Sequence, residues 1–123
     1  MAYDEKLADR VRRMLSGKQE VAEKKMMGAL TFMVRGNMCC GVTGTALMVR
    51  VGSAGYEIAL AQPHVRPMEI GGRRPRAFIC VEAQGCATDA ALAEWVSRGV
   101  AFVSSLDRKD AADKKSGSFV TRR

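Results

Sequence analysis

The chain has 123 residues and a formal net charge of +7, with 47% hydrophobic and 27% charged residues. This length fits one domain and excludes a second one of comparable size. No apolar run approaches the ~20 residues that span a bilayer, and the charged start AYDEKLADR is unlike a secretory signal, so we expect a cytoplasmic protein without membrane association.

Residues 4–15 form the first segment with a clear helical period. Leu7, Val11, Met14 and Leu15 fall on one stripe, and Asp4 precedes them as a suitable N-cap. The segment predicts an amphipathic helix that covers a core. The next segment, residues 21–27, predicts a strand at the sheet edge, where its charged side chains discourage pairing with other chains.

Residues 24–51 are the centre of the predicted fold and indicate an antiparallel meander. Its strands are expected at residues 30–35, 38–42 and 46–51, which are rich in aromatic, β-branched and sulfur side chains. Gly36-Asn37 suits a two-residue type II′ turn, and residues 43–45 are expected to form a three-residue loop. The turn places Val34 opposite Cys39 and Phe32 opposite Gly41.

This register assigns the side chains of the meander to two faces. The predicted core face carries Leu30, Phe32, Val34, Cys39, Gly41, Leu47, Val49 and Val51. The other face carries Thr31, Met33, Arg35, Met38, Cys40, Val42, Met48 and Arg50. If no helix covers it, this second face exposes an apolar patch, and we predict that Met33, Met38, Cys40 and Met48 contact a second copy of the chain or another protein.

The segment after the meander predicts a short helix that begins at Gly52-Ser53 and ends at Gln62-Pro63. A loop with a proline at each end then presents His64, the only histidine. No acid or nucleophile is marked as its partner, so we interpret His64 as a structural residue rather than a catalyst. Residues 68–70 and 77–83 are expected to be strands.

A basic loop, Gly71-Gly72-Arg73-Arg74-Pro75-Arg76, separates these two strands. Glycines beside Arg73, Arg74 and Arg76 suit the binding of an anion or a nucleic acid. A solvated hairpin tip has the same composition, and the loop lacks aromatic side chains for base stacking.

Four cysteines allow two readings. Cys39 and Cys40 are adjacent on a strand and are expected to point to opposite faces, so they do not form a metal-binding pair. With Cys80 they are interpreted as small hydrophobic strand residues. Cys86 lies close to a helix start, where exposure and the helix dipole favour a reactive thiolate. A thiol sensor at Cys86 and a metal site that includes His64 therefore remain alternative interpretations, although no metal or cofactor is expected.

The last predicted helix begins after Thr88, a suitable cap, and carries one unbroken apolar stripe. The stripe consists of Leu92, Trp95, Val96, Gly99, Phe102, Val103 and Leu106. Gly99 lowers helix propensity, so its place on the stripe predicts a close approach to the sheet. Residues 107–123 lack the apolar content to pack and are expected to form a basic, disordered tail.

Several motifs together resemble the N-terminal domain of the TfoX/Sxy family. They are AYDEKLADRVR, EKKMMGALTFMVRGNMCCGV, LMVRVG, PHVRPM and LAEWVSRGVAFVSSL, in this order. The resemblance covers residues 1 to about 106 and implies a two-layer α+β domain, with an antiparallel sheet of about five strands, helices on one face and a secretion-chaperone-like fold. Met27 stands where the family usually has phenylalanine, and the loop with Arg73 is more basic than usual.

The resemblance also implies a class of function. Longer family members are competence regulators that act with the transcription machinery and carry a second helical domain, whereas this chain resembles the stand-alone form. It offers no catalytic residues to transfer. We therefore predict a non-enzymatic regulatory module that acts as a homodimer or with a protein partner. Nucleic-acid binding through the basic loop and tail is the first alternative, and thiol or metal chemistry is the second.

Overall fold

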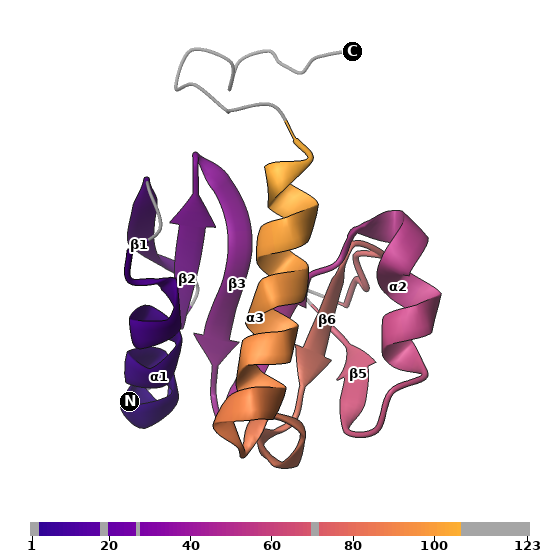
Figure 1. The fold of residues 1–123 in the computed structure, drawn as a ribbon. Helices are drawn as coiled ribbons and strands as arrows, with labels where there is room; N and C mark the ends of the chain where they lie inside the picture. Colours follow the sequence, from indigo (N-terminus) through magenta and orange to yellow (C-terminus); the bar gives the residue numbers. More distant parts are fainter. Residues whose placement is uncertain (1–2, 18–19, 27, 70–71, 107–123) are drawn as a thin grey trace.

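A six-stranded antiparallel sheet and three α-helices make up the part of the chain that the computed structural model describes, residues 3–17, 20–26, 28–69 and 72–106 (Figure 1). In chain order the elements are α1 (Glu5–Leu15), β1 (Val21–Met26), β2 (Ala29–Val34), β3 (Asn37–Thr43), β4 (Ala46–Arg50), α2 (Gly52–Leu60), β5 (Val65–Pro67), β6 (Phe78–Val81), the 3-10 helix η1 (Ala83–Cys86) and α3 (Asp89–Ser104). The strand order is β1-β2-β3-β4-β6-β5. This arrangement confirms the predicted α+β class.

The sheet has six strands, whereas the resemblance implied about five, and one short strand forms before the position predicted for it. β5 covers Val65–Pro67 and pairs with β6, whereas a strand was predicted at residues 68–70. Pro67 has no N–H to donate and therefore suits the last position of an edge strand. Met27, Ile70 and the tail predicted at residues 107–123 lie outside the described residues.

Both long helices begin at the caps that the sequence predicts. The Asp4 carboxylate accepts hydrogen bonds from the backbone N–H groups of Lys6 at 2.9 Å and Leu7 at 3.4 Å. The Thr88 hydroxyl oxygen accepts one from the N–H of Ala91 at 3.1 Å. These bonds satisfy donors that a helix start leaves without partners. No helix of the described residues has both the length and the apolarity needed to cross a bilayer.

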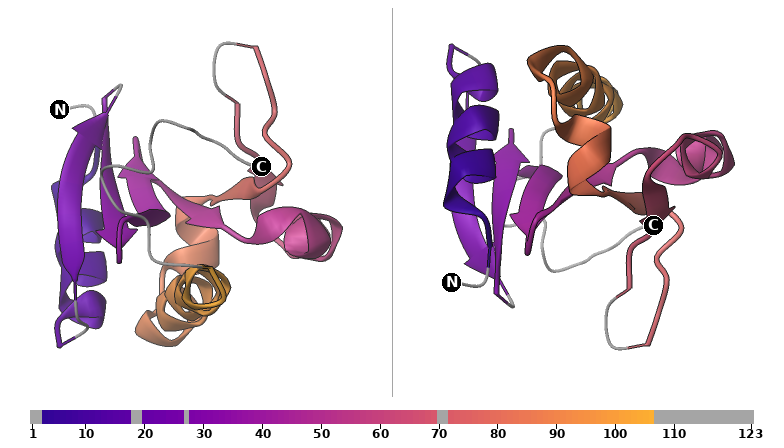
Figure 2. Two further views of the ribbon diagram at one scale, coloured as in Figure 1. Left: turned by 90° about the horizontal axis from the view of Figure 1, so that it is seen from above. Right: turned by 90° about the horizontal axis from the view of Figure 1, so that it is seen from below.

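The apolar sides of α1 and α3 cover one face of the sheet. Leu7 and Val11 of α1, Phe32 of β2 and Trp95 of α3 belong to the same buried cluster. α3 contacts β3 and β4, and α2 packs beside β5 and β6 at the far edge. Figure 2 shows α3 on one side of the sheet and the loop between β5 and β6 projecting from the other side. The two sides of the sheet therefore have different surroundings.

At Gly99, α3 approaches the sheet closely. A Cβ atom at this position would lie 2.9 Å from the carbonyl oxygen of Cys39 and 3.1 Å from its sulfur. The close approach predicted for this glycine is therefore confirmed. Helix α3 sits on β3 at a distance that only a residue without a side chain permits.

The register between β2 and β3 differs from the prediction. Val34 pairs with Asn37, so the two turn residues are Arg35 and Gly36, with φ angles of 54° and 83° as in a type I′ turn. The register then shifts between Phe32 and Met33, which leaves one extra residue in β3. Together the moved turn and the bulge shift the pairing of the inner residues by one.

This one-residue difference reverses the predicted faces of three β3 residues. Phe32 pairs with Cys40, and Leu30 pairs with Val42. Cys40 and Val42 therefore lie on the helix-covered face, whereas Gly41 lies on the other face. Cys39 also belongs to the core cluster, so the adjacent cysteines do not point to opposite faces as expected. The following turn is also shorter than predicted, because Thr43 pairs directly with Ala46. Leu47 and Val49 lie in the core, as predicted.

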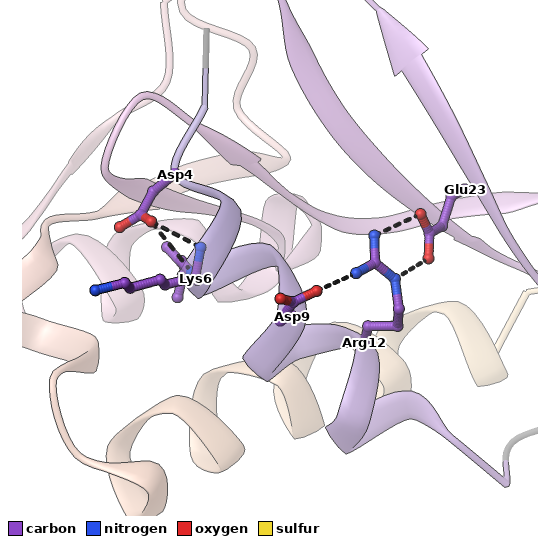
Figure 3. A network of polar contacts seen from close by, with 6 residues as sticks. Asp4, Lys6, Asp9, Arg12 and Glu23 are labelled. Carbon is purple, nitrogen blue, oxygen red and sulfur yellow. Dashed lines mark hydrogen bonds and ion pairs between the residues drawn. The ribbon is translucent and has the colours of Figure 1, made fainter. Parts of the chain in front are cut away.

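An ion-pair network ties α1 to the edge strand β1 (Figure 3). The guanidinium group of Arg12 donates two hydrogen bonds to the Glu23 carboxylate, one of them from Nη2 to Oε1 at 2.8 Å, and a third to Asp9. The hydrogen bond from Arg12 is the main cause that lowers the pKa of Glu23 below its ordinary value of 4.5. Both side chains are partly exposed, so solvent screens the pair.

Glu23→Gln is expected to lower the free energy of unfolding by about 0.2–1 kcal/mol at neutral pH. Because the pKa of Glu23 is lowered in the folded state, its stabilisation is fully present above the unfolded pKa. It is lost as the pH falls through the folded pKa. Urea unfolding of both proteins between pH 7 and 3 should therefore show a difference that disappears in acid, and a difference that grows in acid would contradict the assignment. Arg13→Gln, next to Arg12, is the control.

Candidate interaction face

The face of the sheet that α1 and α3 leave free has its own hydrophobic cluster. A row of directly paired residues crosses it from β2 to β6, and the row consists of Thr31, Gly41, Met48 and Cys80. The buried members of the cluster are Ala46, Met48 and Cys80, against which Met38, Met68 and Phe78 pack with part of their surface exposed. The cluster is separate from the main core on the helix side.

A groove of about 350 Å³ opens over this row, and we call it the methionine groove. Its lining residues are Met26, Ala29, Thr31, Met38, Thr43, Met48, Arg66, Met68, Glu69 and Cys80. Four of the ten are methionines, whose flexible and polarisable side chains adapt to differently shaped partners. The groove therefore offers an adaptable, largely apolar surface on this face of the sheet.

The floor of the methionine groove depends on Gly41. A Cβ atom at Gly41 would lie 2.7 Å from Cε of Met48 and 2.8 Å from the carbonyl oxygen of Leu30. Met48 therefore lies over the bare backbone of β3, where only glycine leaves room for it. The neighbouring Thr31 hydroxyl donates a hydrogen bond to the carbonyl oxygen of Lys24 at 2.7 Å, so this buried polar group is satisfied.

One wall of the groove comes from the start of the loop between β5 and β6. Met68 and Glu69 line the groove from this loop, which projects away from α3 (Figure 2). Nε of Arg74 donates to Oε2 of Glu69 at 2.7 Å across the loop. Arg66 lines the groove from β5 and forms an ion pair with Glu82. Both carboxylates beside the groove are thus engaged by arginines.

Of the four residues predicted to contact a partner, the structure places only two in the lining of the groove. Met38 and Met48 line the groove, but Met48 is only 2% exposed because Met38, Met68 and Phe78 pack around it. Met33 pairs with Met38 and is half-buried beside the groove. Cys40 does not belong to this face, since the bulge turns it into the main core.

The groove residues that were not predicted include Met26, Met68 and Cys80. Cys80 could have been found from the alternation along its own strand. Ile79 and Val81 fall on one face of β6, so Phe78 and Cys80 fall on the other. The same alternation in β1 places Met26 on the side of Lys24. Met68 carried no such signal, because the strand expected at residues 68–70 forms earlier in the chain.

The basic loop is partly neutralised by neighbouring acids. Arg74 pairs with Glu69, and Nη2 of Arg76 lies 2.9 Å from Oε2 of Glu57 on α2. The Arg76 guanidinium also stacks on the ring of Tyr56, 4.8 Å from its centroid. Arg73 has no ion pair among the described residues. Anion or nucleic-acid binding by Arg73, Arg74 and Arg76 stays a prediction.

Arg50 lies at the end of β4, beside the groove residue Met38 and also against Phe102 of α3. Its guanidinium lies between the rings of Phe78 and Phe102, 5.7 Å and 5.4 Å from their centroids. Its Nη1 reaches the carbonyl oxygen of Met38 at 3.5 Å, and its buried Nε has no hydrogen-bond acceptor within the described part of the chain. Burial lowers the pKa of Arg50 from its ordinary value. Aromatic contacts rather than a carboxylate hold this cation.

The structure corrects the expectation that Cys86 is exposed. The sequence placed this residue just before a helix, but the 3-10 turn η1 intervenes and leaves Cys86 only 2% exposed. Its sulfur donates a hydrogen bond to the carbonyl oxygen of Glu82 at 3.6 Å, and burial raises the pKa of the thiol. A reactive thiolate is therefore disfavoured at this position.

His64 lies in an exposed turn with a φ angle of 65°. Its backbone carbonyl oxygen accepts a hydrogen bond from the N–H of Glu82 at 2.8 Å, so the residue connects two segments through its main chain. Among the residues with described positions, no group of three or more histidine, cysteine, aspartate or glutamate side chains could hold a metal ion.

All four cysteines are expected to resist thiol reagents in the folded protein. Cys39 and Cys40 are fully buried, and Cys80 and Cys86 are 2% exposed with pKa values that burial raises. Titration with a chromogenic disulfide reagent at pH 8 should therefore detect no fast thiol before denaturation and four after it. One fast thiol per folded chain, removed by Cys86→Ser, would restore the sensor hypothesis.

A family model described as the TfoX N-terminal domain matches residues 13–103. The matched region contains β1 to β6, α2 and nearly all of α3. It therefore includes the whole methionine groove and the loop with Arg73. No curated protein and no solved structure matches the chain.

Proposed function

The chain belongs to the TfoX N-terminal domain family, and on that premise we propose that it is a non-enzymatic regulatory module that binds a protein partner through the methionine groove. The resemblance implies regulation for longer members of the family, which supports this class of function. The single observation that carries the proposal is an apolar groove on the sheet face that α1 and α3 leave free.

The composition of the groove favours contact with a protein. Its floor is made by buried apolar side chains, and partly exposed methionines at positions 26, 38 and 68 surround it. An apolar side chain from a partner would remove these thioethers from water without burying an unpaired polar group. Contiguous apolar surface with a polar rim is typical of protein interaction sites.

Site-specific photo-crosslinking tests this proposal. A photoreactive phenylalanine analogue is introduced at Met68 in the groove or, as the control, at Ile58, an apolar side chain that is 67% exposed on α2. In cells that express the protein, we expect a discrete crosslinked partner from position 68 and none from position 58. Its mass distinguishes a second copy from another protein. Crosslinks from position 58 alone, or from neither, would contradict the proposal.

A further inference from the structure

We propose that the partner segment in the methionine groove is acidic: an apolar stretch flanked by aspartate or glutamate side chains. The inference rests on the proposed function and adds the chemistry of the partner. Its basis is the distribution of ion pairs around the groove, where the cations outnumber the carboxylates that neutralise them.

Lys24 and Arg66 stand at the two ends of the row that crosses the groove. Lys24 of β1 pairs directly with Thr31, and Arg66 of β5 pairs directly with Cys80. Lys24 is exposed and has no ion pair within the described residues. A segment that lies along this row would therefore meet an unpaired cation at the Lys24 end, whereas Arg66 at the other end is already paired with Glu82.

The carboxylates next to the groove are already engaged. Glu69 binds Arg74 and Glu82 binds Arg66, so neither is left to neutralise the remaining cations. Arg50 contacts aromatic rings and a carbonyl oxygen, and it has no carboxylate partner among the residues whose positions are described. The uncompensated charge around the groove is therefore positive, which selects a partner of opposite charge.

The same distribution disfavours two other occupants. A second copy docked through the same face would bring the uncompensated cations Lys24 and Arg50 of both chains to one interface, and like charges at an interface oppose association. Proteins that bind single-stranded nucleic acids use aromatic platforms for the bases, and none of the described residues that line the groove is aromatic. An acidic peptide satisfies both the charge at the rim and the apolar floor.

Lys24 and Lys25 provide a matched pair of variants for the test. They are adjacent and exposed, but Lys24 pairs with groove-lining Thr31 whereas Lys25 pairs with Leu30 of the main core, so they lie on opposite faces. Lys24→Glu and Lys25→Glu change the net charge equally. Arg50→Leu is a second variant, which removes a charge while keeping an apolar side chain between Phe78 and Phe102. Thermal melting confirms that each variant is folded.

The experiment selects displayed random 12-residue peptides on the immobilised full-length chain and then measures binding of a fluorescent synthetic copy of the best one. We expect the selected peptides to combine large apolar residues with aspartate or glutamate. Lys24→Glu should weaken binding by about fivefold or more, as should Arg50→Leu, whereas Lys25→Glu should change it by less than about twofold. Added salt should weaken binding further.

Other results would contradict either the acidic partner or the groove itself as the binding site. Apolar peptides without acidic residues, or equal effects of Lys24→Glu and Lys25→Glu, would overturn the inference while the proposed groove stands. Peptide binding that Met68→Glu does not weaken would overturn the proposed function itself. Self-association that Met68→Glu abolishes would identify a second copy as the occupant, and displacement of the peptide by a single-stranded oligonucleotide would identify a nucleic acid. Either result would reject the acidic peptide.

Discussion

Gly99→Leu is expected to lower the free energy of unfolding by about 3 kcal/mol, because α3 cannot keep its position with a side chain at this point. A Cβ atom alone would lie 2.9 Å from the carbonyl oxygen of Cys39, which belongs to the backbone of β3 and cannot rotate away. The helix must therefore move off the sheet and lose contacts along its apolar side. Urea unfolding followed by circular dichroism measures the change.

Ala93→Leu is the control for this prediction, because Ala93 is exposed on the same helix. Its substitution adds the three carbons of leucine beyond Cβ without meeting the sheet, so the unfolding free energy should change by less than about 0.5 kcal/mol. Equal effects at the two positions would show that α3 does not approach β3 as closely as the structure indicates.

Phe32→Ala is expected to lower the free energy of unfolding by about 3–5 kcal/mol, the largest effect of any single truncation considered. Phe32 is fully buried in β2, in the same cluster as Val11 of α1 and Trp95 of α3. Its removal would leave a cavity between the sheet and both helices. The stability of an average domain is about 5–15 kcal/mol, so the variant should be close to unfolding at 37 °C.

Ile58→Ala provides the comparison for Phe32→Ala. Ile58 is also large and apolar, but it is 67% exposed, so its truncation should cost less than about 0.5 kcal/mol. Chemical unfolding of the two variants under the same conditions separates the effect of burial from the effect of losing an apolar side chain. Similar losses from both would contradict the placement of Phe32 in the main core.

The sequence predicted the fold where one physical rule dominates each position. Asp4 and Thr88 were identified as caps because short polar side chains satisfy free N–H groups at helix starts, and both make these hydrogen bonds. Gly99 was identified because a glycine on an apolar helical stripe needs a packing reason. Leu47 and Val49 were placed in the core by strict alternation along β4.

The register of β3 could not be predicted from the same rules. Cys39 and Cys40 are small, both tolerate burial, and neither shows which of them occupies the extra position of a bulge. The turn also admits two placements, because Gly36 suits either the first or the second turn position. A difference of one residue exchanged Cys40 and Gly41 between faces, and with them part of the predicted interaction surface.

The methionine groove was predicted only in part because it depends on long-range contacts. Met38 and Met48 were found from alternation within the meander, but Met68 reaches the groove from a loop that follows β5. The burial of Cys86 likewise depends on η1, whose 3-10 geometry was not expected between β6 and α3. Such contacts depend on how separate elements meet, which local sequence patterns do not specify.

The most direct test of the methionine groove as the binding site is methyl NMR of the protein labelled at the ε-methyl groups of its eight methionines. Titration with the selected acidic peptide should shift the signals of Met38, Met48 and Met68 in the groove. The signal of Met14, which lies between α1 and α3 on the opposite side, should stay unchanged. A shift of Met14 with no change in the groove methionines would show that the partner binds the helix side instead.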